Sequence, residues 1–209
     1  MRRLGLQGVV RGSKCRTTIS KPMTNGPADL VNRQFVARRP NQLWVADFIY
    51  VATWSGFVYV SFVIAVDSRR LIGWRVSQSL KKELVLEAFE QALWSRAGVK
   101  GTIHHSDRGS QYLPIRYTDR LVEAGAEPSV GSTGDSDDNA LAESLIGLYK
   151  TEVIERRGPW RRLEEVEYAS LEWGDWFNNR RILEPLGNRP PVEYEKMYES
   201  QQQESATAA

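Results

Sequence analysis

The spacing of hydrophobic residues divides the first half of the core into strands and a helix. Three apolar stretches rich in β-branched and aromatic residues predict strands at residues 43–52, 57–66 and 71–77, with a turn at residues 54–56. Apolar side chains then recur at helical spacing, which predicts an amphipathic helix over residues 82–97. Its apolar face consists of Val85, Ala88, Phe89, Ala92 and Leu93.

The second half of the core alternates shorter strands with helices. A fourth strand is predicted at residues 102–107, and a helix with proline in its first turn at residues 114–124. A short fifth strand around residues 129–130 leads into a glycine-containing loop at residues 131–137. A helix carrying Glu143 and a last long helix over residues 163–178 complete an α/β pattern.

The two ends of the chain differ from this core in composition. Residues 1–40 read as an extended arm that holds nine Lys or Arg against one acid, Asp29, whereas the remainder has 19 basic and 25 acidic residues. Such an arm suits phosphate backbones, and the alternative is a solvated tail without a partner. We therefore expect an arm at residues 1–40, a core at 41–194 and a disordered tail at 195–209.

The composition excludes several classes of protein. The chain has 209 residues, of which 41% are hydrophobic and 26% charged, as in globular proteins, and no apolar run approaches the ~20 residues that span a bilayer. One cysteine allows no internal disulfide, which fits a reducing cytoplasm. Two adjacent histidines and one cysteine do not favour a zinc site.

Three acidic residues carry the candidate chemistry. Asp47 lies inside an apolar strand, where a carboxylate is costly unless its charge is compensated. Asp107 closes the fourth strand, and Glu143 follows it after 35 intervening residues, on a helix. Three carboxylates brought together supply the hard oxygen ligands that hold Mg²⁺ or Mn²⁺. The pattern indicates metal-dependent phosphoryl transfer on nucleic acid.

The sequence motifs around these acids resemble those of the insertion-sequence transposases whose catalytic part is encoded by the second of two overlapping frames. The resemblance runs from about residue 33 to about residue 194. The matching words are Pro40-Asn41-Gln42-Leu43-Trp44-Val45-Ala46-Asp47, Ser68-Arg69-Arg70-Leu71-Ile72-Gly73-Trp74, His105-Ser106-Asp107-Arg108-Gly109-Ser110-Gln111-Tyr112, Asp138-Asn139-Ala140-Leu141-Ala142-Glu143-Ser144 and Trp176-Phe177-Asn178-Asn179-Arg180-Arg181.

The resemblance implies a fold, an activity and partners. The fold is ribonuclease H-like, with a mixed five-stranded sheet flanked by helices. The activity is metal-dependent cleavage and transfer of DNA strands, with two Mg²⁺ or Mn²⁺ ions. Asp47 would bridge the ions, while Asp107 and Glu143 would each complete one of them. The implied partners are DNA, further copies of the chain on DNA, and an upstream-frame helix-turn-helix protein.

Three further residues are candidates for DNA contact. Lys150 follows Glu143 by seven residues, which is ~700° of helix, so both side chains leave nearly the same face. It could clamp a phosphate or be a solvated lysine. Asn139 could orient a ligand or cap the helix, and Asp138 could also be the cap. Arg108 could contact phosphate, whereas His105 is more simply a packed strand residue.

Two rival functions and two departures from the family pattern accompany this interpretation. The rivals are a stand-alone ribonuclease H-like nuclease, which cuts without joining, and a truncated DNA-binding regulator without catalysis. Ala65 stands where the family pattern has an acid, Asp67 where it has an aromatic residue, and Asp137 where tyrosine is common. None of these positions belongs to the three acids.

Overall fold

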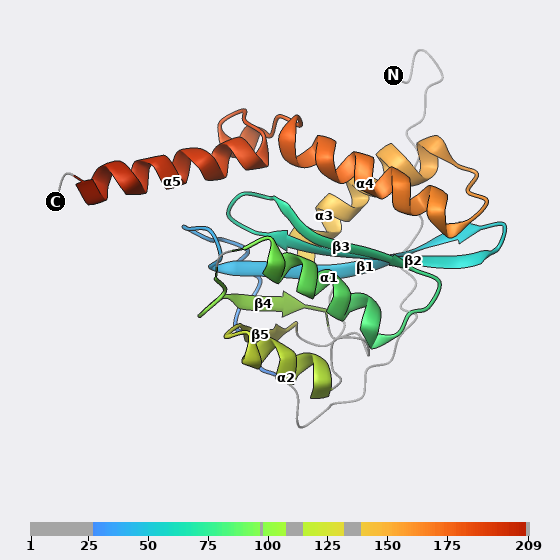
Figure 1. Cartoon of the computed structure of the whole chain (residues 1–209), viewed down its shortest axis with the longest axis horizontal. Helices are drawn as coiled ribbons and strands as arrows, with labels where there is room; N and C mark the ends of the chain where they lie inside the picture. The colour runs from blue at the N-terminus through green and yellow to red at the C-terminus, as the bar shows by residue number, and fades with distance from the viewer. Residues whose placement is uncertain (1–26, 97, 108–114, 132–138, 208–209) are drawn as a thin grey trace, which may run out of the picture.

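The computed structural model describes residues 27–96, 98–107, 115–131 and 139–207. Five strands form one sheet in the order β3-β2-β1-β4-β5 (Figure 1). Strands β1 (Leu43–Thr53), β2 (Gly56–Ala65) and β3 (Leu71–Ser77) are antiparallel neighbours. The short strands β4 (Ile103–Ser106) and β5 (Glu127–Val130) run parallel to β1. The sheet is therefore mixed and five-stranded, as the sequence predicted.

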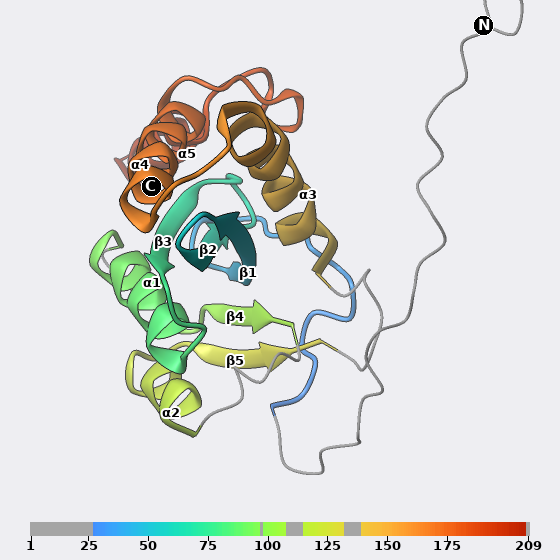
Figure 2. The same ribbon diagram turned by 90° about the vertical axis from the view of Figure 1, so that its right-hand side faces the viewer.

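Helices cover both faces of the sheet, as Figure 2 shows end-on. Helices α1 (Lys82–Trp94) and α2 (Ile115–Glu123) pack on one face. Helices α3 (Ala140–Tyr149) and α4 (Leu163–Asn179) pack on the other. Helices α1, α2 and α4 lie within a few residues of their predicted ranges, and α3 carries Glu143 as predicted.

Alternation along β1 divides the core in two. Val45, Ile49 and Val51 belong to the cluster shared with α3 and α4, whereas Trp44 and Ala46 belong to the cluster shared with α1 and α2. Because successive side chains of a strand point to opposite faces, Asp47 shares the α3 side with the first group. A single polar residue in that row places a carboxylate beneath α3.

The helix α3 continues without a break into a π-helical segment, η3 (Lys150–Glu155), which the sequence pattern did not predict. A half-buried polar network fastens this segment to α4 and to the residues just after it. Glu152 accepts a hydrogen bond from Trp173 Nε1 at 2.8 Å and pairs with Arg181 at 2.5 Å. π-Helical turns are rare in proteins, but those that occur are frequently at functional sites. This one begins at Lys150.

The arm expected over residues 1–40 lies partly outside the described residues, and its remainder packs on the core. Residues 27–40 contain no helix or strand, in agreement with an extended conformation. Val31 is buried in the main core, and the backbone N–H of Leu30 donates to Ser129 Oγ at 2.9 Å. The packed core therefore begins before residue 41, because Val31, Phe35 and Ala37 of the arm pack in the cluster shared with α3 and α4.

The prediction of a disordered tail at residues 195–209 is wrong for its described part. Helix α5 (Pro191–Thr207) extends from the body of the protein, as Figure 1 shows in red. After Pro191 the segment contains no glycine or proline, and the buried carboxylate of Glu195 anchors its first turns. None of the helices in the described ranges is long and apolar enough to cross a membrane.

Candidate active site

Asp47 lies at the middle of β1, the central strand. It stands opposite Phe62 of β2, and its carboxylate accepts a hydrogen bond from the backbone N–H of Phe48 at 2.7 Å. The neighbouring Val45 is fully buried, so this carboxylate projects from an apolar strand.

Parallel pairing brings Asp107 to the same place. Ser106, the last residue of β4, stands beside Ala46 of β1, so the residues that follow each of them, Asp107 and Asp47, leave neighbouring strands at the same level. Glu143 lies in the first turn of α3 and is exposed.

The other two acids act electrostatically on Asp47. Burial is the largest cause that raises its pKa, to about 7, and the charge of Asp107 is the next. The charge of Glu143 raises the pKa further, whereas the N–H of Phe48 and the charge of Lys150 lower it. The structure thus brings Asp47, Asp107, Glu143 and Lys150 into one electrostatic neighbourhood.

The acids are near one another without forming a compact cage. Within the described part of the chain, no group of three His, Cys, Asp or Glu side chains is arranged to hold a metal ion. Repulsion among like charges opposes closer approach, and Asp47 uses one oxygen to accept the Phe48 N–H. The set of three carboxylates nevertheless has the hard oxygen chemistry that suits Mg²⁺ or Mn²⁺.

Lys150 occupies the position that helical spacing predicted. It is exposed at the start of η3, and both it and Glu143 act on the pKa of Asp47. The inward side of α3 is apolar, with Leu141, Leu145 and Tyr149 buried.

Asn139 lies where α3 begins, but its side chain makes no capping hydrogen bond to the helix. It is 1% exposed, and its Nδ2 donates to the carbonyl oxygen of Ala46 at 3.0 Å. The capping interpretation is therefore wrong, because the amide reaches across to β1 instead. Asp138 and Arg108 lie outside the described residues.

The two histidines are packed residues, as predicted for His105. His105 Nδ1 lies 2.9 Å from Ser129 Oγ, and His104 Nε2 lies 2.7 Å from the hydroxyl of Tyr117. Burial lowers the pKa of His104 to about 3, so this ring is neutral and structural.

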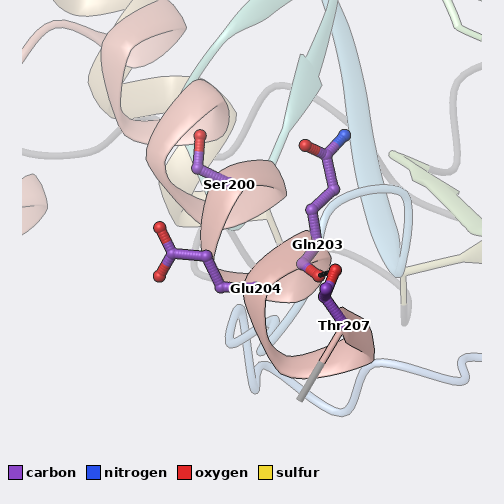
Figure 3. Close-up of a pocket in the computed structure, with 4 residues that line it drawn as sticks. All are labelled: Ser200, Gln203, Glu204 and Thr207. Atoms are coloured by element: carbon purple, nitrogen blue, oxygen red, sulfur yellow. Dashed lines mark hydrogen bonds between the residues drawn. The ribbon is translucent and has the colours of Figure 1, made fainter. Parts of the chain in front are cut away.

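A hollow beside the outer half of α5 is unrelated to these acids. Ser200, Gln203, Glu204 and Thr207 line it, all from one helix (Figure 3). Because its lining comes from one face of a single helix, this hollow is an open surface. The neighbourhood of Asp47 is therefore the candidate active site.

Comparison with known proteins agrees with the geometry. Two models of the integrase core domain match, one over residues 37–136 and one over residues 124–191. The transposase for insertion sequence element IS629 of Shigella sonnei is 60% identical over 195 residues, covering 93% of this chain and 65% of that protein. A protein of insertion sequence element IS986/IS6110 from Mycobacterium tuberculosis is 53% identical, covering 99% of this chain and 76% of the relative.

This chain belongs to the insertion-sequence transposases. It spans 65% of the length of the Shigella transposase, slightly under two thirds. Its structure resembles the HTLV-2 integrase catalytic core domain in complex with magnesium, with a TM-score of 0.60 and 13% identity over 77% of this chain and 99% of that one. The likeness shows the fold alone, and it confirms the ribonuclease H-like fold of this transposase family member.

Proposed function

We propose that this protein is the catalytic core of a DNA transposase, which cleaves DNA strands and transfers them to a new phosphate. The proposal is supported above all by the charges of Asp107 and Glu143 acting on the half-buried Asp47, in a member of the transposase family. In such an enzyme these three residues would be the acids that act on a phosphodiester.

The three acids have a common place in the proposed reaction. Asp47, held on the central strand, would hold two Mg²⁺ or Mn²⁺ ions together with Asp107 and Glu143. Divalent ions, when bound, neutralise the phosphate and lower the pKa of an attacking oxygen. The ammonium of Lys150 would hold a neighbouring phosphate of the same strand. Arg108 is a further candidate for phosphate contact.

The proposed partners follow from this chemistry. The substrates are the DNA ends of a mobile element and a target DNA, and the protein works as a homo-oligomer on them. An upstream-frame protein with a helix-turn-helix would supply sequence recognition. No helix among the described residues could span a membrane. We also propose that the protein acts, bound to DNA, in the cytoplasm.

The first prediction tests the three acids directly. Asp47→Asn, Asp107→Asn and Glu143→Gln should each abolish cleavage and joining of element-end DNA in the presence of Mg²⁺, because each removes a charge that holds the ions. The assay follows labelled oligonucleotides on denaturing gels, and circular dichroism checks that each variant is folded.

Asp119→Asn, an equivalent change at an exposed position of α2, is the matched control and should keep full activity. A folded variant of any of the three acids that retained more than a few per cent of the wild-type rate would exclude that residue. If the wild type cleaves DNA without joining it, the protein is a nuclease. If it neither cleaves nor joins DNA, it is a regulator.

A further inference from the structure

The hairpin between β1 and β2 ends in an exposed tryptophan that the proposed reaction does not use. Trp54 is 70% exposed, although large aromatic side chains are usually covered. The guanidinium of Arg161 lies 5.2 Å from the centroid of its ring. One side of the indole is therefore occupied by a cation, and most of the side chain remains open to solvent.

The hairpin tip is fixed to a basic loop. The backbone N–H of Trp54 donates to the carbonyl of Trp160 at 3.0 Å, and Ser55 Oγ donates to the carbonyl of Arg161 at 3.2 Å. Thr53 also forms a bridge with Trp160. An aromatic ring held by backbone bonds loses little conformational entropy when a ligand stacks on it.

The loop carries concentrated positive charge. Residues 156–162 contain four arginines and no acid, at positions Arg156, Arg157, Arg161 and Arg162. Arg157 pairs with Glu172, whereas Arg156 and Arg162 are exposed and form no ion pair within the residues that the structure describes. Such a surface attracts a polyanion.

We propose that Trp54, together with Arg161 and the basic loop, binds unpaired DNA by stacking on a base. Stacking of bases on aromatic rings beside cations is the physical basis of single-strand binding, and it is indifferent to sequence. Charge complementarity favours a nucleic acid over a second protein, because a protein interface would have to bury these unpaired guanidinium groups.

The location connects this surface to the candidate active site. Six residues separate Asp47 from Thr53 along β1, which is about 20 Å at the rise of a strand. At a stacked spacing of about 3.4 Å per nucleotide, the base on Trp54 would lie about six nucleotides from the reacting phosphate. The assignment to the reacting strand rests on the proposed function, whereas binding itself does not.

The test measures binding of two labelled single strands to the full chain by fluorescence anisotropy, with chelator and at raised salt. One strand is a 20-nucleotide oligothymidine, and the other is an abasic strand of equal length and charge. Trp54→Ala should weaken binding of oligothymidine about tenfold or more and leave binding of the abasic strand unchanged. Trp54→Phe should retain most of the affinity.

Two further variants separate the contributions of ring and charge. Arg161→Ala should weaken binding of both strands, because a phosphate contact is lost. Trp94→Ala removes a tryptophan that is 91% exposed at the end of α1 and should change neither affinity.

If Trp54→Ala lost affinity for both strands equally, or lost none, the proposal would be overturned. A self-association of the wild type that Trp54→Ala abolishes, without an effect on oligothymidine, would identify a protein interface instead. Because chelator prevents metal-dependent chemistry, these outcomes are independent of whether the protein joins DNA.

Discussion

Asn139 joins β1, which carries Asp47, to α3, which carries Glu143. Its amide donates to the carbonyl of Ala46, one residue before Asp47, while its backbone begins the helix that bears Glu143. A side chain that is 1% exposed presents no surface to DNA. We therefore expect Asn139 to act as a positioning residue that sets the distance between α3 and β1.

Replacement of Asn139 tests this role. Asn139→Ala removes one hydrogen bond, so the free energy of unfolding should fall by about 1 kcal/mol. If the residue positions the acids, the strand-cleavage rate and the affinity for Mn²⁺ should fall as well, beyond the effect on stability. Chemical denaturation, cleavage assays and Mn²⁺ titration measure the three quantities.

Ser144→Ala is the matched control, because Ser144 is exposed and bonds the carbonyl of Ala140 within its own helix. It should leave the cleavage rate unchanged. If Asn139→Ala kept the normal strand-cleavage rate and the normal affinity for Mn²⁺, the role of Asn139 would be purely structural.

Asp47 bears the electrostatic strain of the metal-free site. Its burial and the charges of Asp107 and Glu143 disfavour its ionised form. Asp47→Asn should therefore melt higher than the wild type in chelator. Mn²⁺ at a hundredfold excess over its dissociation constant should add ~2.7 kcal/mol to the wild type and much less to the variant.

Melting curves of both proteins with chelator and with Mn²⁺ make the comparison. A wild type without any metal-dependent rise would argue against a metal site at these acids. A variant that melts well below the wild type in chelator would show that Asp47 stabilises the fold instead.

At the scale of elements, a buried ionic cluster attaches helix α5 to the sheet. Glu195 is 3% exposed and accepts hydrogen bonds from Ser68 at 2.6 Å, from Arg70 at 2.6 Å and from Arg96 at 2.7 and 3.1 Å. Although burial raises the pKa of Glu195, the bonds and charge of Arg96, with smaller contributions from Ser68 and Arg70, lower it below 4.5 overall. These contacts explain why a polar, mostly exposed helix has a fixed starting point.

Glu195→Gln should destabilise the protein by about 3 kcal/mol near neutral pH, because it leaves the buried guanidinium of Arg96 and the half-buried one of Arg70 without this partner charge. A carboxylate whose folded-state pKa is lowered contributes stability above its unfolded value and loses it as the pH falls through the folded value. The difference between variant and wild type should therefore shrink below about pH 4.5. Urea denaturation across pH measures it.

Asp67 provides the opposite case in the same cluster. Burial and the charge of Glu195 raise its pKa to about 6. Because ionised Asp67 then opposes folding, Asp67→Asn should melt higher than the wild type at pH 8 and lose this advantage as the pH falls from about 6 to about 4. A variant that melts lower than the wild type at pH 8 would show that Asp67 pairs favourably with Arg96.

At the scale of the whole molecule, we expect the basic arm to have two parts with different roles. Residues 1–26 hold six cations, Arg2, Arg3, Arg11, Lys14, Arg16 and Lys21, whereas residues 27–37 include apolar side chains packed on the core. Deletion of residues 1–26 should flatten the salt dependence of DNA binding, because fewer counterions are released. Affinity measured between low and high salt gives the slope.

Deletion of residues 1–32 is the informative contrast, because it also removes the buried Val31. It should lower the melting temperature in addition to the salt slope, whereas the shorter deletion should leave melting unchanged. An unaltered slope after either deletion would show that the arm does not contact DNA.

The sequence by itself determined the features that depend on local spacing. Apolar runs and helical periodicity located the strands and the helices of the core, because side chains two or 3.6 residues apart share a face wherever the element packs. The sequence motifs around Asp47, Asp107 and Glu143 likewise indicated the family. The spacing of Lys150 from Glu143 predicted that both leave nearly the same face of the helix.

Only the tertiary structure decided which distant groups meet. Asn139 forms its bond with a residue 93 positions away, and Glu195 with partners about a hundred or more positions away. Local pattern gave α5 no apolar stripe, so its order depends on a buried carboxylate whose partners lie on other elements. Trp54 and Arg161 meet for the same reason: pairing of Thr53 with Trp160 brings together a hairpin and a loop that no sequence period connects.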